Sequence, residues 1–284
     1  MSKYKESIMK TIFFVAACTS ILAVALICLF LFINGIPAMT KIGIFDFLMG
    51  TTWKANNTPP SFGILPMILG SIYVTAGAAV IGVPIGILTA VFMAHYCPPK
   101  LYRILKPAIN LLAGIPSIVY GFFGLVVIVP FIRDTFGGDG NSMLAASILL
   151  GIMILPTIVG ISESAIRAIP QSYYEGALAL GASHERSIFF VILPAAKSGI
   201  MAAIVLGIGR AIGETMAVIM VAGNQARMPA GLLKGVRTLT ANIIIEMGYA
   251  AELHREALIA TSVVLFVFIL IINLLLSLLK RRTG

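Results

Sequence analysis

Long uncharged runs alternate with short charged segments along the chain. Five runs are apolar enough to cross a bilayer, which takes about 20 residues for ~30 Å of hydrocarbon, and a sixth is as apolar but carries Arg210 and Glu214. The predicted spans are residues 11–34, 67–94, 107–132, 142–163, 198–222 and 257–279. This pattern predicts an all-α polytopic membrane protein with a single transmembrane domain over residues 1–284.

The second uncharged run is longer than one upright span requires. It covers residues 61–94, which is about 51 Å of helix at ~1.5 Å per residue. Its beginning, residues 59–66, contains three prolines. We therefore expect residues 59–66 to form an interfacial or re-entrant piece that precedes the span.

Basic residues gather in alternate connections. The amino end, the second-to-third connection, the fourth-to-fifth connection and the carboxyl end each hold three: Lys3, Lys5, Lys10; Lys100, Arg103, Lys106; Arg167, Arg186, Lys197; and Lys280, Arg281, Arg282. The other connections hold fewer basic residues, mixed with acidic ones: Lys41, Lys54, Arg133, Arg227, Lys234, Arg237 and Arg255. By the positive-inside tendency, the first set faces the cytoplasm. We expect a multi-pass inner-membrane protein with both termini in the cytoplasm.

Composition agrees with this class. Hydrophobic residues make up 59% of the 284 and charged residues 11%, whereas a soluble domain has about 25% charged residues. The net charge of +9 does not indicate nucleic-acid binding, because the basic residues flank spans and do not cluster on one surface. The apolar stretch 12–33 exceeds the core of a signal peptide, so we expect an uncleaved first span.

Several kinds of chemistry have no signal in the sequence. The cysteines Cys18, Cys28 and Cys97 show no metal-binding spacing, and the three histidines are isolated. The chain lacks a Gly-rich loop ending in GK[ST], a zinc motif and a GxSxG elbow. We therefore expect a transporter subunit that is not an enzyme and holds no cofactor, with ATP and Mg²⁺ bound by another polypeptide.

The cytoplasmic loop 164–197 is expected to hold a short helix. Pro170 and Pro194 mark turns, and between them Tyr174, Ala177, Leu178 and Gly181 recur at helical spacing. The loop is too short to bury the apolar face of this helix, so the face needs a groove on a partner. The alternative is an amphipathic helix lying on the membrane surface, but its polar face is not rich in Lys and Arg.

The spacing within this loop carries a family resemblance. Glu175, Ala177 and Gly181, followed by Leu193-Pro194, resemble the EAA loop of ABC importer permeases. Two further stretches, 114–121 (GIPSIVYG) and 210–218 (RAIGETMAV), are similar to the PstC-type permeases of phosphate ABC importers. The sister PstA-type subunit usually continues Gly-Glu-Thr with Ala-Pro, where this chain has Met216-Ala217, and this favours the PstC type.

The resemblance implies a six-helix ABC importer permease fold with a cytoplasmic coupling helix around residues 175–182. It further implies a PstA-type permease partner, two copies of a PstB-type ATPase, and a PstS-type phosphate-binding protein outside. The segments 34–60 and 224–256 would form the surface that receives the binding protein. Membrane lipid is the other expected partner.

Arg210 and Glu214 are expected near the middle of the fifth span. Arg210 lies about 18 Å into that span, and a charge at such a depth usually marks function. A guanidinium fork fits an oxyanion, and Glu214, four residues on, is expected on the same helix face, where it neutralises Arg210 until substrate arrives. A purely structural ion pair is the alternative.

Other functions fit the sequence less well. An Arg fork does not by itself select phosphate, so a permease for sulfate, molybdate or tungstate stays open. An intramembrane enzyme lacks a paired nucleophile, and a sensor leaves the EAA spacing without a purpose. A secondary transporter commonly shows an internal repeat of helices, and none is clear here.

Overall fold

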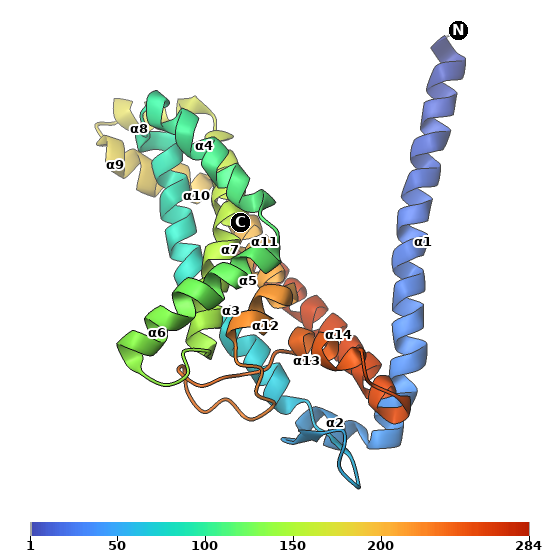
Figure 1. The fold of residues 1–284 in the computed structure, drawn as a ribbon. Helices are drawn as coiled ribbons and strands as arrows, with labels where there is room; N and C mark the ends of the chain where they lie inside the picture. The colour runs from blue at the N-terminus through green and yellow to red at the C-terminus, as the bar shows by residue number, and fades with distance from the viewer. Residues whose placement is uncertain (1, 284) are drawn as a thin grey trace.

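The structure is a computed structural model that describes the backbone of residues 2–283. The side chains of residues 1–3, 276, 277 and 279–284 lie outside the described part. The predicted cytoplasmic cations Lys3, Lys280, Arg281 and Arg282 are among them. Almost all regular structure is helical (Figure 1), and strands β1 (Trp53–Lys54) and β2 (Ser61–Phe62) form one antiparallel hairpin.

Two long helices form the centre of the bundle. Helices α3 (Leu65–Val91) and α7 (Met143–Arg167) lie side by side, and small residues of α3 make this approach possible. A Cβ atom added to Gly82 would lie 2.7 Å from the Ile154 side chain, and one added to Gly86 would lie 2.7 Å from Ile158. The glycines therefore form a groove that the α7 isoleucines fill, and the short π-helix η1 (Phe92–Tyr96) extends α3.

The third predicted span is divided in the structure. Helix α4 (Pro99–Gly114) ends before Ile115-Pro116, and a second arm follows as α5 (Ser117–Phe123), π-helix η2 (Gly124–Ile128) and α6 (Val129–Phe136). The prediction of one continuous span over 107–132 was therefore wrong at its start. Proline has no N–H to donate and disfavours a helical residue before it, so the chain bends there.

The segment after α7 bends repeatedly before it re-enters the bundle. Helices α8 (Gln171–Ala179) and α9 (His184–Ser187) precede π-helix η3 (Ile188–Ile192) and α10 (Leu193–Ala195). A bend of 68° separates His184–Ala195 from α11 (Lys197–Gly213). Helix α12 (Met216–Val221) follows after a second break.

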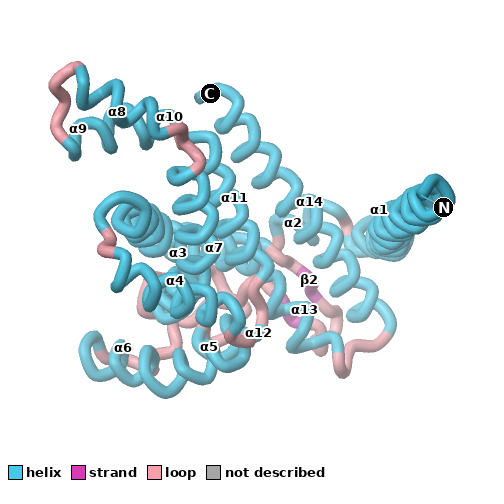
Figure 2. The backbone as a smooth tube through the Cα atoms, turned by 90° about the horizontal axis from the view of Figure 1, so that it is seen from above, coloured by secondary structure: helices cyan, strands magenta, loops and turns pink. Residues whose placement is uncertain are grey.

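Helix α1 (Ser2–Ile42) stands away from the bundle for most of its length (Figures 1 and 2) and contacts α14 (Glu252–Thr283) near its carboxyl end. Phe32 meets Phe266 edge-on at 6.1 Å, and Gly35 allows Val263 to approach. Helices α2 (Ile44–Met49) and α13 (Leu239–Met247) lie with the β-hairpin at one end of the molecule. The predicted piece 59–66 belongs to this hairpin and to the start of α3, so it forms no re-entrant helix.

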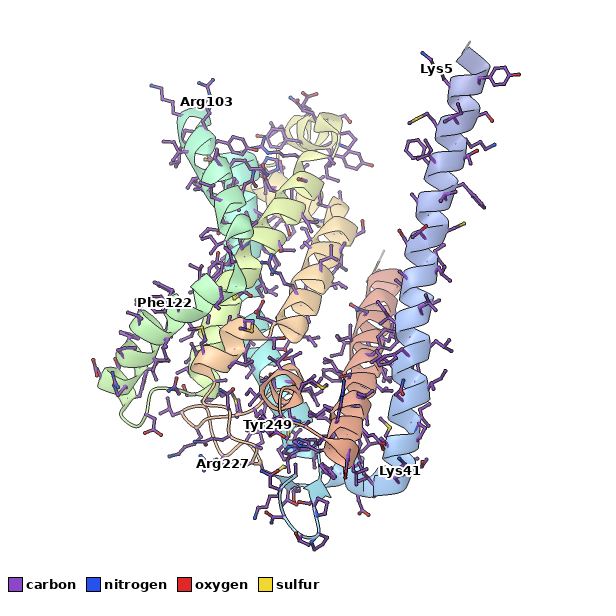
Figure 3. All side chains as sticks on the ribbon, turned by 45° about the vertical axis from the view of Figure 1, so that its right-hand side comes forward. Lys5, Lys41, Arg103, Phe122, Arg227 and Tyr249 are labelled. Carbon is purple, nitrogen blue, oxygen red and sulfur yellow. The ribbon has the colours of Figure 1, made fainter. Side chains whose placement is uncertain are left out.

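The coupling loop and the hairpin lie at opposite ends of the bundle. Lys5 and Arg103 lie at the end that holds α8 and α9, which we call the coupling end, whereas Lys41, Arg227 and Tyr249 lie at the opposite end (Figures 1 and 3). Five helices in the described part are long and apolar enough to cross a membrane, or up to six if the bent segment 184–213 counts as one. The predicted all-α polytopic architecture is confirmed.

Candidate functional site

The predicted coupling motif lies in a protruding unit made of α8 and α9, residues 171–187, which we call the coupling unit (Figure 2). The helix is shifted from its predicted position, since it begins at Gln171 and ends at Ala179. Gly181 lies beyond its end at φ 85°, with its N–H bonded to the Leu178 carbonyl at 2.9 Å. The Ala182 N–H bonds to the Ala177 carbonyl at 3.1 Å. These two bonds form a Schellman cap, so glycine provides a sharp turn here.

Most side chains of the coupling unit are uncovered within the chain. Ala177 is buried, whereas Glu175 is exposed and Leu180 is 91% exposed. Phe190, just after the unit, is 74% exposed. Leu193 and Pro194 lie in α10, just before the 68° bend that leads into α11. The motif residues Glu175, Ala177, Gly181, Leu193 and Pro194 thus follow one another along a bent, largely exposed segment.

Arg210 and Glu214 are not paired as predicted. Helix α11 ends at Gly213, and Glu214 has extended backbone with ψ 132°, so the two residues do not share a helix face. The Glu214 carboxylate accepts hydrogen bonds from the N–H groups of Thr215 at 3.1 Å and Ala217 at 3.3 Å. Both side chains are described, and no ion pair joins them. The carboxylate instead caps the first turn of α12, where a helix favours negative charge.

Arg210 reaches α7 instead. Its Nη1 atom donates to the Thr157 hydroxyl at 3.4 Å, which is a long contact. The side chain is half-buried in the last turn of α11, one turn from the break at Glu214. A guanidinium has five N–H donors, so most of its hydrogen-bonding capacity is not used by Thr157.

The two broken spans pack against each other. A Cβ atom added to Gly121 of α5 would lie 3.0 Å from the Cα of Ala217 in α12 and 2.7 Å from the sulfur of Met220. The Tyr120 hydroxyl donates to the Leu112 carbonyl at 2.9 Å and so joins α4 to α5 across their break. The sequence stretches 114–121 and 210–218 therefore meet in space, although nearly a hundred residues separate them.

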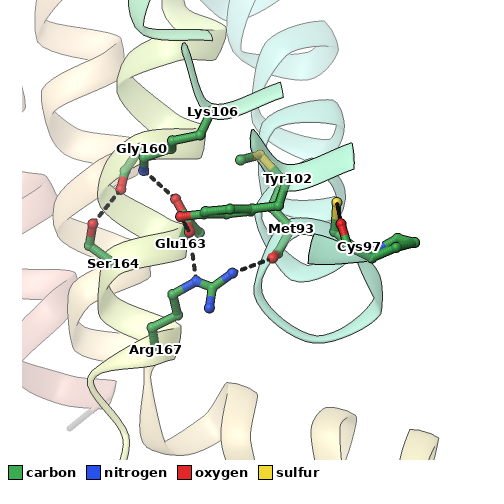
Figure 4. Close-up of polar contacts among 9 residues, drawn as sticks. Met93, Cys97, Tyr102, Lys106, Gly160, Glu163, Ser164 and Arg167 are labelled. Atoms are coloured by element: carbon green, nitrogen blue, oxygen red, sulfur yellow. Dashed lines mark hydrogen bonds and ion pairs between the residues drawn. The ribbon is translucent and has the colours of Figure 1, made fainter. Parts of the chain in front are cut away.

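A buried carboxylate that the sequence analysis missed lies at the coupling end. Glu163 of α7 is 1% exposed and accepts hydrogen bonds from Tyr102 at 2.7 Å, from Arg167 Nε at 2.7 Å and from Lys106 (Figure 4). Arg167 also donates to the Met93 carbonyl at 2.7 Å and lies over the Tyr102 ring, 4.6 Å from its centre. We call Glu163, Tyr102, Lys106 and Arg167 the Glu163 cluster.

The negative charge of the Glu163 carboxylate is compensated within the cluster. A buried carboxylate is tolerated only when it is paired and hydrogen-bonded, and here two cations and a phenol surround it. The hydrogen bond to Glu163 raises the pKa of the Tyr102 hydroxyl, and burial adds to the effect. A signal was present in the sequence, because Glu163 and Arg167 are spaced i and i+4 at the end of an apolar run.

A second missed cluster lies at the opposite end. Glu246 of α13 accepts hydrogen bonds from Trp53 Nε1 at 2.7 Å and Arg237 Nη1 at 2.5 Å, and it contacts His254 Nε2 at 2.8 Å. These four residues, the Glu246 cluster, line a cavity of about 230 Å³ together with Tyr249. Burial raises the pKa of the Tyr249 hydroxyl, and the nearby Glu246 charge acts in the same direction.

Most of the chain matches a known protein family. Residues 82–284 match the family described as the inner membrane component of binding-protein-dependent transport systems. The chain belongs to this family. The matched segment contains the coupling unit, both broken spans and both buried carboxylates, whereas α1 precedes it. The predicted resemblance to ABC importer permeases is confirmed, and the permease is a multi-pass component of the inner membrane.

Individual relatives cover most of the permease. The probable ABC transporter permease protein YqgH of Bacillus subtilis is 41% identical over 93% of this chain and 89% of its own length. The phosphate transport system permease protein PstC of Mesorhizobium japonicum is 34% identical over 89% of this chain and 84% of its own length. Among solved structures, the inward-facing MetNI methionine ABC transporter is similar over 78% of this chain and 96% of the compared chain, with a TM-score of 0.63 and 22% identity. This last likeness shows the permease fold.

Proposed function

We propose that this chain is the PstC-type permease subunit of an ATP-driven importer that moves inorganic phosphate into the cytoplasm. The observation that carries the proposal is the meeting of the two PstC-like stretches at the packed breaks of α5 and α12, beside Arg210. Relatives named phosphate transport permeases at 34% identity support the substrate. The permease carries out no chemistry of its own, and a separate ATPase hydrolyses ATP with Mg²⁺.

The coupling unit supports docking to that ATPase. Leu180, Phe189 and Phe190 are large apolar side chains that the chain leaves exposed, and a group of such side chains on a cytoplasmic protrusion favours a contact with another protein. Glu175, Ala177 and Gly181 lie in the helix and its turn, while Leu193 and Pro194 lie just before the bend into α11. Movement of the coupling unit would therefore be delivered to the helix that carries Arg210.

The two ends of the bundle are assigned to different partners. The coupling end, with Lys5 and Arg103, faces the cytoplasm by the positive-inside tendency, so both termini are assigned to that side. Two copies of a PstB-type ATPase would bind the coupling units of this chain and of a PstA-type partner. A PstS-type binding protein would deliver phosphate to the opposite end, where segments 34–60 and 224–256 lie.

Arg210 is assigned to the substrate path. Its guanidinium has one weak hydrogen bond to Thr157 and lies one turn before the break at Glu214, so it can offer a bidentate fork to an oxyanion. Glu214 has a different role from the one predicted, because its carboxylate holds the first turn of α12 and leaves Arg210 unneutralised. We assign Glu214 to maintaining the break that admits the anion.

The test is ATP-dependent uptake of radiolabelled phosphate in vesicles that contain this chain and its three presumed partners. Uptake that requires ATP, and that excess sulfate, molybdate or tungstate does not suppress, supports the proposal. Suppression by one of these anions would instead indicate a permease for that oxyanion, which is the second candidate because an Arg fork binds all of them.

Arg210→Lys tests the substrate path within the same assay. Lysine keeps the positive charge but loses the planar fork, so uptake is expected to fall while assembly and ATP hydrolysis continue. Lys197→Arg at the start of α11 is a matched control, because Lys197 is exposed and lies far along the helix from the breaks. Unchanged uptake in a normally assembled Arg210→Lys complex contradicts the assignment.

A further inference from the structure

Glu163 lies where three structural elements of the coupling end meet. Its carboxylate binds Tyr102 and Lys106 of α4 and Arg167 of its own helix α7 (Figure 4). Arg167 in turn holds the Met93 carbonyl in η1 at 2.7 Å. One buried carboxylate therefore ties α4, the end of α7 and the end of the α3 helix together.

The coupling unit begins immediately after this junction. Arg167 is the last residue of α7, and α8 begins at Gln171. A displacement of α8 therefore reaches Arg167 through a connection of three residues, 168–170. Because Arg167 is bound to Glu163 and to Met93, the displacement is passed to the helices that these residues join.

Helix α4 depends on the junction for its position. Along α4 no side chain is fully buried, and Tyr102, Leu105 and Ile109 are only partly covered by the bundle. Its far end is the bend at Ile115-Pro116, where a Cβ on Gly114 would meet nothing within 4 Å. Apart from this partial packing, the hydrogen bonds of Tyr102 and Lys106 to Glu163 are the side-chain bonds that hold α4 to α7 in the described part of the chain.

The arm ends at the substrate path. Beyond the bend, α5 packs on α12 through Gly121, and α12 begins at the break beside Arg210. Tyr120, the fourth residue of α5, bonds back to the Leu112 carbonyl of α4 at 2.9 Å. Movement of α4 is thereby carried to α5 and on to the two packed breaks.

We propose that Glu163 is a positioning residue that clamps α4 to the end of α7, so that α4 follows the coupling unit and transmits its displacement to the breaks beside Arg210. The inference rests on the proposed function, because it requires an ATPase that moves the coupling unit. It assigns to α4 a second mechanical route, separate from the direct connection through the bend after α10.

Glu163→Gln is the informative variant, since glutamine keeps the size of the side chain and removes its charge. Lys106 and Arg167 then lie next to each other without a counter-charge and repel, which releases α4 from α7. The expected result in proteoliposomes of the complete transporter is that ATP hydrolysis stays close to wild type while phosphate moved per ATP falls roughly tenfold, within the range of coupling free energies between sites.

Two lysines of α4 give a matched comparison. Lys106 binds Glu163, whereas Lys100 on the same helix is exposed and forms no ion pair in the described part of the chain. Lys106→Met is expected to lower the ratio of phosphate to ATP, and Lys100→Met is expected to leave it unchanged. A ratio that stays at the wild-type value in both Glu163→Gln and Lys106→Met overturns the proposal.

A distance measurement separates this inference from the proposed function. Spin labels at Arg103 of α4 and Ser164 of α7, in a variant without native cysteines, report whether the two helices move as one body. We expect the same narrow distance distribution in nucleotide-free and vanadate-trapped wild-type complexes, and a broad one in Glu163→Gln. Equal distributions in wild type and Glu163→Gln reject the clamp, even if the wild-type complex imports some other substrate.

Discussion

The Glu246 cluster gives a quantitative prediction about the end opposite the coupling unit. Glu246→Ala removes a carboxylate whose side chain is 8% exposed and which three residues contact. Arg237 is left with a side chain only 15% exposed and no acidic partner in the cluster. We therefore expect Glu246→Ala to destabilise this end of the permease strongly.

The size of the destabilisation depends on the hydrogen bonds that Arg237 retains in the variant. Breaking a buried ion pair costs about 3–5 kcal/mol, but Arg237 retains hydrogen bonds to the Asn224 carbonyl at 2.9 Å and Asn242 Oδ1 at 3.0 Å. The cost is therefore placed at the low end, about 3 kcal/mol. At ~2 °C per kcal/mol for a chain of this size, the melting temperature falls by roughly 6 °C.

Trp53 can serve as a fluorescent probe of this cluster, and the exposed Lys41–Glu256 pair offers a control variant. Trp53 is the only tryptophan, and its indole N–H donates to Glu246, so its fluorescence during heating in detergent reports this cluster directly. Helical circular dichroism measures global unfolding in the same samples. The matched control is Lys41→Met, which breaks the Lys41–Glu256 pair near the same end, whose side chains are 58% and 40% exposed. An exposed pair contributes at most about 1 kcal/mol.

The refuting result is a Glu246→Ala protein that melts within about 1 °C of Lys41→Met, because the difference worked out above is several times larger. Glu246→Leu combined with Arg237→Met is expected to recover part of the loss, since removing both charges leaves no uncompensated ion. If the double variant is less stable than Glu246→Ala, charge is not the cause of the effect.

Three further predictions concern packing, capping and assembly. Gly121→Val is expected to lower the melting temperature by several degrees, because its Cβ would meet the Ala217 backbone at 3.0 Å. Gly160→Ala, with nothing within 4 Å, should keep or slightly raise the melting temperature, because alanine favours a helix interior over glycine. Ser142→Ala removes the side-chain acceptor for the Ala145 N–H at 3.2 Å and should cost about 1 kcal/mol in chemical unfolding; no change would show that water replaces the cap. Leu180→Glu should abolish co-purification of the ATPase without shifting the melt, and retained binding would place the docking surface elsewhere.

The linear sequence was sufficient for the architecture. Runs of about 20 apolar residues leave no alternative to helices in a bilayer, because backbone groups must bond within the segment. Part of the coupling motif was equally accessible, since Pro170 and Gly181 mark helix ends through their own backbone geometry. The turn predicted at Pro194 was wrong, because Pro194 lies within α10 and the bend follows it, after Ala195.

The helix breaks and the partners of the buried charges were harder to predict from the sequence. A helix at Glu214 and a pair with Arg210 were reasonable from i, i+4 spacing, but the N–H groups of α12 compete for the same carboxylate. In the same way, Pro107 begins an apolar run, yet it belongs to α4 and not to the arm beyond Pro116. Local spacing gives the candidate partners of a charge and does not decide among them.

From its order of residues alone, the chain determined its class and its family motifs, because hydrophobic length and backbone restriction are local properties. Only the tertiary structure decided that Glu163 meets Lys106 and that Glu246 meets Trp53, both from distant segments. It also decided that the motifs at 114–121 and 210–218 meet. A buried charge is stabilised by whichever partners the fold brings within about 3 Å. Those partners lie between 4 and 193 residues away along the chain, so spacing in the sequence does not identify them.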